Sequence, residues 1–362
     1  MRFFLLFFFI SISHAQILVP SRITHGGEIE FTNEWIYQAD GPDKIGKLRG
    51  REYPAAKAMA VIVRSKCRSH GCQVLEVEGK WGPEFHVQMD DGWWFRISYD
   101  PLCIEIQTAP ATVPELYKKQ TVMEELIFAS AREAGFEATA NRSTHMNTGA
   151  RSAFGYDVRS LFNYFVDNAN NPELSTGIFR NNWDTSPPLI ASHDDAGPII
   201  KGIQNQIEKK KIKTFAELSL VVEAALHSIL INPRFNPARN QDLTLRKLKT
   251  LRRRSWFSIF SEQDMPIERR AVRAVRSFKE FILHAELIEA RIAWVKTQPG
   301  FITFKNKKQQ QMLAVDRQDY FENWLKEMNV VPDRYRDLIK ISAPTAPKLK
   351  SQKNSCYIFY AG

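Results

Sequence analysis

The sequence predicts an α+β fold in which an antiparallel or mixed sheet comes first and a helical C-terminal part follows. Segments with strand character dominate residues 17–110, and helical patterns dominate the later half of the 362-residue chain. Regular alternation of strands and helices is missing, which argues against a doubly wound parallel sheet. A content of 44% hydrophobic and 25% charged residues is that of an ordinary globular protein.

The first 15 residues have the pattern of a secretory signal peptide. Arg2 gives a positive start, an apolar run extends from Phe3 to Ile12, and Ala15 is a small residue suited to cleavage. The run is too short to span a bilayer, which takes about 20 apolar residues, although an N-terminal anchor remains the alternative. We therefore expect a secreted or periplasmic protein whose net charge falls from +10 to +9 when Arg2 is removed.

Alternation of apolar and polar residues identifies the segments that we expect to form or support the sheet. In the first part of the chain they are Arg22–Thr32, Ala58–Lys66, Gln73–Glu78, Trp93–Ser98 and Leu102–Thr108. A short strand through Phe136 then leads to His145, and Ile267–Val275 alternates basic and apolar residues like a further strand.

Helical periodicity and capping residues predict the helices of the later part. They are Pro114–Ala134, Tyr156–Asn168, a helix from a Thr214 cap to Ile231, a helix from a Ser277 cap to Lys296, and Asp316–Met328. Residues 170–200 are rich in Asn, Pro, Asp and Ser, which is typical of a long functional loop. The expected divisions are a signal peptide at 1–15, a main domain at 16–300, a helical extension at 301–342 and a tail at 343–362.

Four cysteines in an exported chain allow two disulfides. Cys67 and Cys72 flank a short turn-like segment, so a local bridge is expected there, and Cys103 could pair with Cys356. The alternative for Cys67, His70 and Cys72 is a zinc site, but no second ligand pair stands at a recognisable spacing.

Three strand-like segments place polar side chains two residues apart, so each pair shares one face of its strand. The pairs are Glu28 with Glu30, Glu105 with Gln107, and Glu268 with Arg270. Carboxylates gathered on one face repel each other unless a cation or a basic group joins them, so together they predict a site for a hard metal ion. The alternatives are a solvated strand face and, for His145, a hydrogen-bonded structural histidine.

Four motifs resemble those of the amidoligase family, within the glutamine synthetase-like carboxylate–amine ligase superfamily. Gly27-Glu28-Ile29-Glu30-Phe31 resembles its first strand, and Asp100 followed by Glu105, Thr108 and Pro110 resembles its Glu-x-x-Thr/Ser-x-Pro strand. Ser143-Thr144-His145-Met146-Asn147 is similar to its His strand, and Ile267-Glu268-Arg269-Arg270 to its Glu-x-Arg strand. The segments occur in family order over most of the chain.

The resemblance implies a glutamine synthetase-like sheet and ATP-dependent joining of a carboxylate to an amine through an acyl phosphate, with Mg²⁺ bridging the phosphates. It also implies a role for each matched residue. Metal ligands would be Glu28, Glu30, Glu105, His145 and Glu268; catalytic residues Glu28, Glu105 and Arg270; and nucleotide contacts His145, Asn147 and Arg270. Position 147 departs from the family pattern, since Asn stands where a second His is common, yet its side chain still offers an oxygen.

The implied partners are a small-molecule or peptide carboxylate and an amine. Two alternatives come from other classes: an exported non-catalytic binding protein on the same fold, and a basic protein that binds anionic polymers. The second rests on the basic stretch Arg246–Trp256. No recognisable nucleic-acid-reading module surrounds that stretch, which argues against a nucleic-acid partner.

Overall fold

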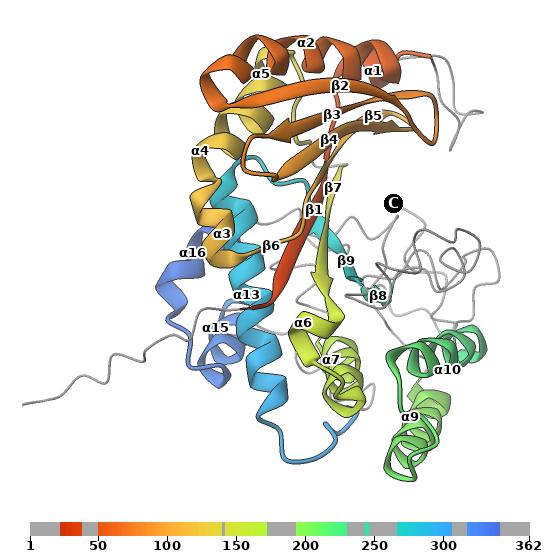
Figure 1. Cartoon of the computed structure of the whole chain (residues 1–362). Helices are drawn as coiled ribbons and strands as arrows, with labels where there is room; N and C mark the ends of the chain where they lie inside the picture. Colours follow the sequence, from red (N-terminus) through yellow and green to blue (C-terminus); the bar gives the residue numbers. More distant parts are fainter. Residues whose placement is uncertain are drawn as a thin grey trace, which may run out of the picture.

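The computed structural model describes residues 22–37, 50–139, 142–171, 193–229, 243–245, 266–305 and 317–340 (Figure 1). The expected signal peptide, the basic stretch 246–256, Cys356 and the tail 343–362 lie outside these ranges. No helix among the described residues combines the length and the apolar character that crossing a bilayer requires.

The fold is mixed α/β and is built on an open antiparallel sheet, which has nine strands within the described ranges. The strands are β1 (Thr24–Phe31), β2 (Cys72–Glu78), β3 (Pro83–Met89), β4 (Trp94–Asp100), β5 (Cys103–Thr108), β6 (Ala111–Thr112), β7 (Ser143–Gly149), β8 (Leu243–Leu245) and β9 (Pro266–Arg273). Their spatial order is β2-β3-β4-β5-β1-β7-β9-β8, and β6 pairs with β1.

Helices cover one face of the sheet and extend below it (Figure 1). They are α1 (Glu34–Tyr37), α2 (Glu52–His70), α3 (Val113–Lys118), α4 (Gln120–Val122), the π-helical turn η2 (Met123–Ala129), α5 (Ser130–Glu133), α6 (Ala150–Phe154), α7 (Val158–Asn170), α9 (His193–Glu208), α10 (Phe215–Ile229), α13 (Phe278–Lys296), α15 (Arg317–Glu327), the 3₁₀ turn η3 (Pro332–Tyr335) and α16 (Arg336–Lys340). In Figure 1, α2 lies over strands β2 to β5, and α13 runs beside β1.

Most of the expected elements are confirmed within a few residues. The strands expected near residues 22–32, 73–78, 93–98, 102–108 and 267–275 correspond to β1, β2, β4, β5 and β9. The Ser277 hydroxyl accepts a hydrogen bond from the Glu280 amide at the start of α13, and Thr214 caps α10 through the Glu217 amide at 3.1 Å. The long helix expected from Pro114 is divided into α3, α4, η2 and α5.

Two expectations are wrong in part. The segment Ala58–Lys66 belongs to helix α2 and not to a strand, because its buried residues recur every three or four positions, as at Ala56, Met59, Ala60 and Val63. The loop expected at 170–200 ends in helix α9, which begins at His193, while residues 172–192 lie outside the described part.

The sheet has one apolar and one polar face, and the apolar face carries the hydrophobic core. Ile29 of β1 and Ile106 of β5 are paired neighbours on the apolar face, and both are fully buried. Helix α13 approaches β1 so closely that a Cβ at Gly27 would lie 2.5 Å from the Phe281 ring. The glycine before Glu28 therefore lets this helix pack directly behind the strand that carries the carboxylates.

The C-terminal helices belong to the same core as the sheet. Phe321, Trp324 and Leu325 of α15 are buried in the hydrophobic cluster that also contains the β1 side chains. On the surface, Arg334 donates to Glu286 of α13 and to the Tyr117 hydroxyl. Residues 317–340 are therefore packed against residues before 300.

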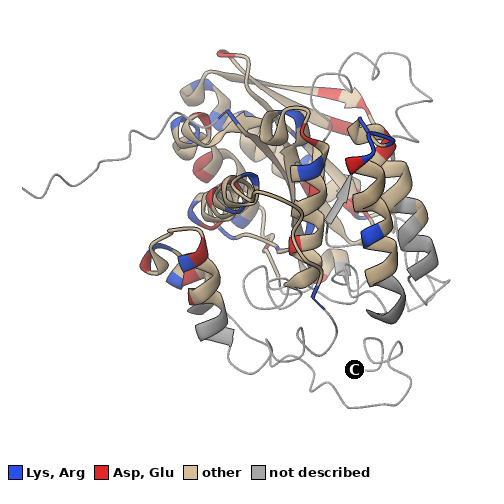
Figure 2. Ribbon diagram, turned by 90° about the horizontal axis from the view of Figure 1, so that it is seen from below, with Lys and Arg blue, Asp and Glu red and all other residues tan. Residues whose placement is uncertain are grey.

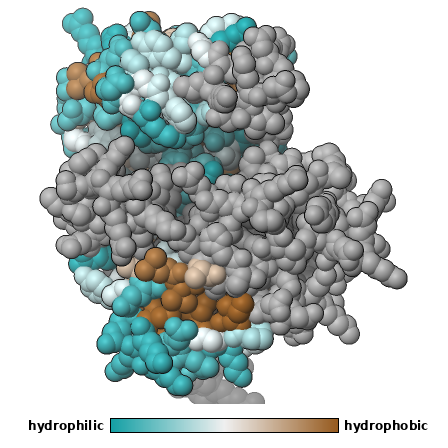
Figure 3. Space-filling view, turned by 90° about the vertical axis from the view of Figure 1, so that its right-hand side faces the viewer, coloured by the Kyte–Doolittle hydropathy of each residue, from teal (hydrophilic) through white to brown (hydrophobic). Residues whose placement is uncertain are grey.

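The described surface mixes both signs of charge, and basic and acidic segments are interspersed over the helices in Figure 2. Figure 3 shows an apolar patch in the lower part of the side on which Figure 1 places α9 and α10. Ile199 and Ile200 of α9, and Phe304, are partly buried and pack against the hydrophobic core.

Cys67 and Cys72 form a disulfide that joins the end of α2 to the start of β2. The local bridge expected from the sequence is thus confirmed, and the alternative zinc site is excluded because both thiols are consumed. Cys103 is a buried free thiol, and its suggested partner Cys356 lies outside the described residues.

Candidate metal centre on the polar face of the sheet

The four motif segments form four neighbouring strands, in the order β5-β1-β7-β9. The register places Glu30 opposite Glu105, Glu28 opposite His145, and Asn147 opposite Glu268. Directly opposed residues in an antiparallel pair share a face, so these side chains emerge on the same, polar side. Segments separated by up to 240 positions in the chain thus meet on one surface.

A β-bulge lies beside His145. Thr144 pairs with Val272 and Met146 with Arg269, so β9 places two residues, at 270 and 271, opposite the single residue His145. A bulge reverses the alternation of faces along its strand. It therefore lets Glu268 and Arg270 face the polar side while Val272 is buried in the core.

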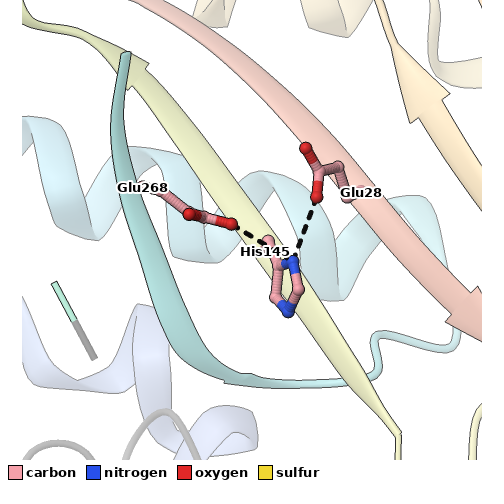
Figure 4. Close-up of side chains that lie close together, drawn as sticks. All are labelled: Glu28, His145 and Glu268. Carbon is pink, nitrogen blue, oxygen red and sulfur yellow. Dashed lines mark hydrogen bonds and ion pairs between the residues drawn. The ribbon is translucent and has the colours of Figure 1, made fainter. Parts of the chain in front are cut away.

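Glu28, His145 and Glu268 form the centre of the site, and Figure 4 shows how they converge from β1, β7 and β9. The His145 Nδ1 atom lies 3.0 Å from Oε2 of Glu28 and 3.3 Å from Oε1 of Glu268. One ligand atom from each of the three residues lies within 4.8 Å of the others, and all three side chains are buried. We call these three residues the acidic centre.

Neighbouring polar groups fix the acidic centre. The His145 Nε2 atom lies 3.1 Å from the Ser143 hydroxyl, and the Asn147 amide donates to Oε1 of Glu28 at 3.4 Å. Arg270 donates from Nη1 to Oε1 of Glu268 at 2.9 Å. Glu30 accepts from the Ser143 backbone amide, and its Oε1 is 4.0 Å from His145 Nε2, so it lies at the rim.

Glu105 lies next to the acidic centre but outside the three residues that converge most closely. Its Oε1 accepts hydrogen bonds from the Gln107 amide and from the Ser98 hydroxyl. Burial, followed by the negative charges of Glu28 and Asp100, raises the pKa of Glu105 to about 8. The second oxygen, Oε2, has no hydrogen bond to any described residue.

His145 has two opposing influences on its proton affinity. Burial lowers the pKa of the imidazole, whereas its hydrogen bond to Glu28 and the charge of Glu268 raise it, and the net shift is upward. A protonated His145 is therefore an internal counter-ion for the two carboxylates. A metal ion bound at Nδ1 would replace that proton.

The donor set fits a divalent cation. In an octahedral site with bonds of about 2.1 Å, adjacent ligand atoms lie about 3.0 Å apart, and the two contacts of His145 Nδ1 are close to that separation. The Asn147 Oδ1 atom is a buried acceptor without a hydrogen-bond donor in the described structure. A bound cation or one of its water ligands would satisfy it.

Nearby side chains that the sequence analysis did not identify continue the polar face across β4 and β3. Arg96 and Ser98 lie opposite Gln107 and Glu105, and Glu84 forms an ion pair with Arg96 at 3.1 Å. The signal available in the sequence was the alternation of β3, where Glu84 and His86 stand between buried apolar residues.

Arg269 and Arg270, adjacent in sequence, serve opposite faces. Arg270 contacts Glu268 in the acidic centre, whereas Arg269 is buried on the helix side and donates to Tyr164 and Asn168 of α7. The sequence marked Arg270 correctly as a neighbour of Glu268, and gave no separate role to Arg269.

No protein-family model and no curated protein matches the chain. A function can therefore be inferred only from the geometry of the site and from the sequence motifs.

Proposed function

We propose that this protein is a divalent-cation-dependent carboxylate–amine ligase that uses ATP and acts on an amino acid or peptide. One observation carries the proposal: Glu28, His145 and Glu268 converge on one face of the sheet, with Glu105 and Arg270 beside them. Carboxylate oxygens gathered in this way are the ligands that hard divalent cations prefer.

The arrangement of the four motifs supports this particular class. A glutamine synthetase-like sheet would need its acidic, histidine and Glu-x-Arg strands side by side with their side chains on one face. The sequence of neighbours β5-β1-β7-β9, antiparallel throughout, fulfils that requirement. Among the described elements, α2 and α13 lie on the opposite, apolar face of the sheet (Figure 1).

In this proposal Glu28, His145 and Glu268 hold a cation, and Glu30 and Glu105 extend the acidic wall. Bound Mg²⁺–ATP supplies the phosphoryl group that activates the carboxylate substrate. The buried Nε of Arg270 has no acceptor among the described residues, and a phosphate oxygen is a suitable one. Arg270, held by Glu268 through Nη1, can thus stabilise negative charge on the transferring group.

Asn147 bears on a second candidate, a non-catalytic cation-binding protein on the same fold. Its position opposite Glu268 brings it to the acidic centre, but it offers an amide oxygen where the family commonly has a second imidazole. A site of this composition can retain a cation without positioning a nucleotide.

The test is binding of a non-hydrolysable ATP analogue to the mature protein, by calorimetry, with Mg²⁺ and with a chelator. We expect binding with Mg²⁺ only, and its loss in Glu28→Gln and in Glu105→Gln. Glu76→Gln is the matched control, because Glu76 is exposed on the remote strand β2 and its replacement should leave affinity unchanged.

The other outcomes separate the candidates. Cation binding without nucleotide binding favours the non-catalytic protein. Binding to an anionic polymer that falls steeply with salt and ignores both substitutions favours the basic polymer-binding protein. A folded protein with no affinity for either cation or nucleotide contradicts the ligase proposal.

A further inference from the structure

A line of polar side chains crosses three strands and ends at Glu105. Glu84 of β3 forms an ion pair with Arg96 of β4, with Oε2 and Nη1 3.1 Å apart. Arg96 donates from Nη2 to Oε1 of Gln107 on β5, and Gln107 donates from Nε2 to Oε1 of Glu105. The register places Arg96 directly opposite Gln107. We call these four residues the polar relay.

The chemistry of arginine fixes the direction of the polar relay. A guanidinium has only donors, so the Gln107 group that faces Arg96 must be the carbonyl oxygen. The Gln107 amide nitrogen must then point the other way, toward Glu105. Without Arg96, the side-chain amide could turn over and place its oxygen against the carboxylate.

The start of the polar relay is anchored as well. Glu84 is buried, and its other oxygen, Oε1, accepts from the Lys80 backbone amide at 3.2 Å. The hydrogen bond at Oε1 holds the Glu84 carboxylate, and its charge, paired with Arg96 at 3.1 Å through Oε2, keeps the guanidinium on this side of β4.

The polar relay decides which oxygen of Glu105 is available. Gln107 donates to Oε1, and the Ser98 hydroxyl shares its one proton between the Glu105 backbone oxygen at 3.1 Å and Oε1 at 3.4 Å, whereas Oε2 has no hydrogen bond to any described residue. The Glu105 carboxylate also lies opposite Glu30, one strand from the acidic centre. Holding Oε1 leaves Oε2 as the oxygen that can act as a ligand.

We propose that Arg96 is a positioning residue, which acts through Gln107 to hold Glu105 with Oε2 ready to bind the cation. This inference rests on the proposed function, because it gives Glu105 a role at the metal site. Groups that orient metal ligands in this way typically change metal affinity by about 10- to 100-fold when they are replaced.

The experiment measures the affinity of the mature chain for Mn²⁺ alone, by electron paramagnetic resonance of the free ion. The variants are Arg96→Lys, which keeps the charge but not the two-armed donor, and Gln107→Met, which keeps size and charge but removes the amide. The matched control is Gln88→Met, the same substitution at an exposed position of β3. Thermal melting of each variant checks folding.

We expect Arg96→Lys and Gln107→Met each to weaken Mn²⁺ binding about tenfold or more, with no further loss when they are combined. In a Glu105→Gln background neither substitution should change the affinity, since both act through that carboxylate. If Arg96 and Gln107 were only structural, their substitutions would lower the melting temperature. Any effect on Mn²⁺ affinity would then be the same with Glu105 and with Gln at position 105. If one variant does not fold, the other decides.

Two results distinguish failure of the Arg96 role from failure of the proposed function. Unchanged affinity in both variants, with Mn²⁺ bound by the native protein and lost in Glu268→Gln, overturns the role of Arg96 and leaves the proposed function standing. Absence of Mn²⁺ binding by the native protein overturns the proposed function and the positioning role together.

Discussion

Two buried charged clusters lie on opposite sides of the sheet, and their compositions differ. On the helix side, Arg291 of α13 donates from Nε to Asp167 of α7 at 2.7 Å and from Nη1 to Glu327 of α15 at 3.0 Å. The guanidinium also lies 3.7 Å from the centre of the Trp294 ring and 4.8 Å from that of Trp324. The Arg291 guanidinium is thus paired with two carboxylates and lies over two indole rings.

The acidic centre on the other side differs in composition, since it combines two carboxylates with one imidazole. Among the described contacts, Glu28 and Glu268 both face the His145 imidazole, Arg270 contacts Glu268, and Glu30 lies at the rim. A buried ion pair between helices holds them together, whereas carboxylates and an imidazole gathered on one strand face are a donor set that a divalent cation can use. Both clusters are buried, so composition and not burial is what separates them, and it is on composition that we propose a structural role for one and cation binding for the other.

The largest effect is expected from Arg291→Met, which leaves Asp167 buried without its cation. Removing one partner of a buried pair costs about 3–5 kcal/mol in the free energy of unfolding, measurable by urea denaturation. Mn²⁺ affinity should not change. The double variant Asp167→Leu/Arg291→Met should recover much of the loss, and a neutral single variant would show that this cluster is not the structural one.

Glu268→Gln should have the opposite profile. Losing one carboxylate of the acidic centre should weaken Mn²⁺ binding about 100-fold, equivalent to about 2.7 kcal/mol, as measured by calorimetry. The unfolding free energy in the presence of a chelator should change little, because the substitution also relieves repulsion among the acids. A large loss of stability with unchanged metal affinity would reverse the assignment of the two clusters.

Metal affinity should rise with pH between about 6 and 8. Below pH 8 the folded protein without a cation keeps a proton on Glu105, whose pKa is raised to about 8, and the raised pKa of His145 has the same direction. A cation must displace these protons, so affinity falls as pH falls, by up to about tenfold per pH unit for each proton released. Calorimetry in two buffers of different ionisation enthalpy gives the number of protons released when the cation binds. The Glu105→Gln variant should release fewer protons than the native protein.

The smallest effect is expected from Tyr164→Phe in α7, which tests whether Arg269 and Glu268, neighbours in β9, act independently. Tyr164→Phe removes one acceptor of the Arg269 guanidinium, at 3.2 Å on the helix side, and leaves the second acceptor, Asn168, in place. We expect a loss of about 1 kcal/mol in stability and no change in Mn²⁺ affinity, since Glu268, the preceding residue, faces the other way. A change in affinity would show that the two faces are coupled through this strand.

Local sequence patterns were sufficient to find the candidate ligands. A spacing of two residues put Glu28 with Glu30 and Glu268 with Arg270 on single faces, and the structure brings one member of each pair to His145. The order of the strands could not be read in this way, because pairing of β1 with β7 depends on contacts between segments more than 100 positions apart. The bulge opposite His145 is likewise a product of packing.

The misread elements have physical explanations of their own. Helix α2 was hidden because its small apolar residues, such as Ala56 and Ala60, resemble a buried strand unless their spacing is counted. Strand β3 begins at a proline and contains Glu84, so its alternating pattern does not stand out in the sequence. Without β3, the ion pair between Glu84 and Arg96 cannot be predicted. The polar relay was therefore invisible before the strands were paired.

The most direct test of the acidic centre is pulsed electron paramagnetic resonance of Mn²⁺ bound to the protein. We predict hyperfine coupling to one imidazole nitrogen, which disappears in His145→Gln. A native protein that binds no Mn²⁺, or that binds it with no nitrogen coupling, would contradict a metal centre formed by Glu28, His145 and Glu268.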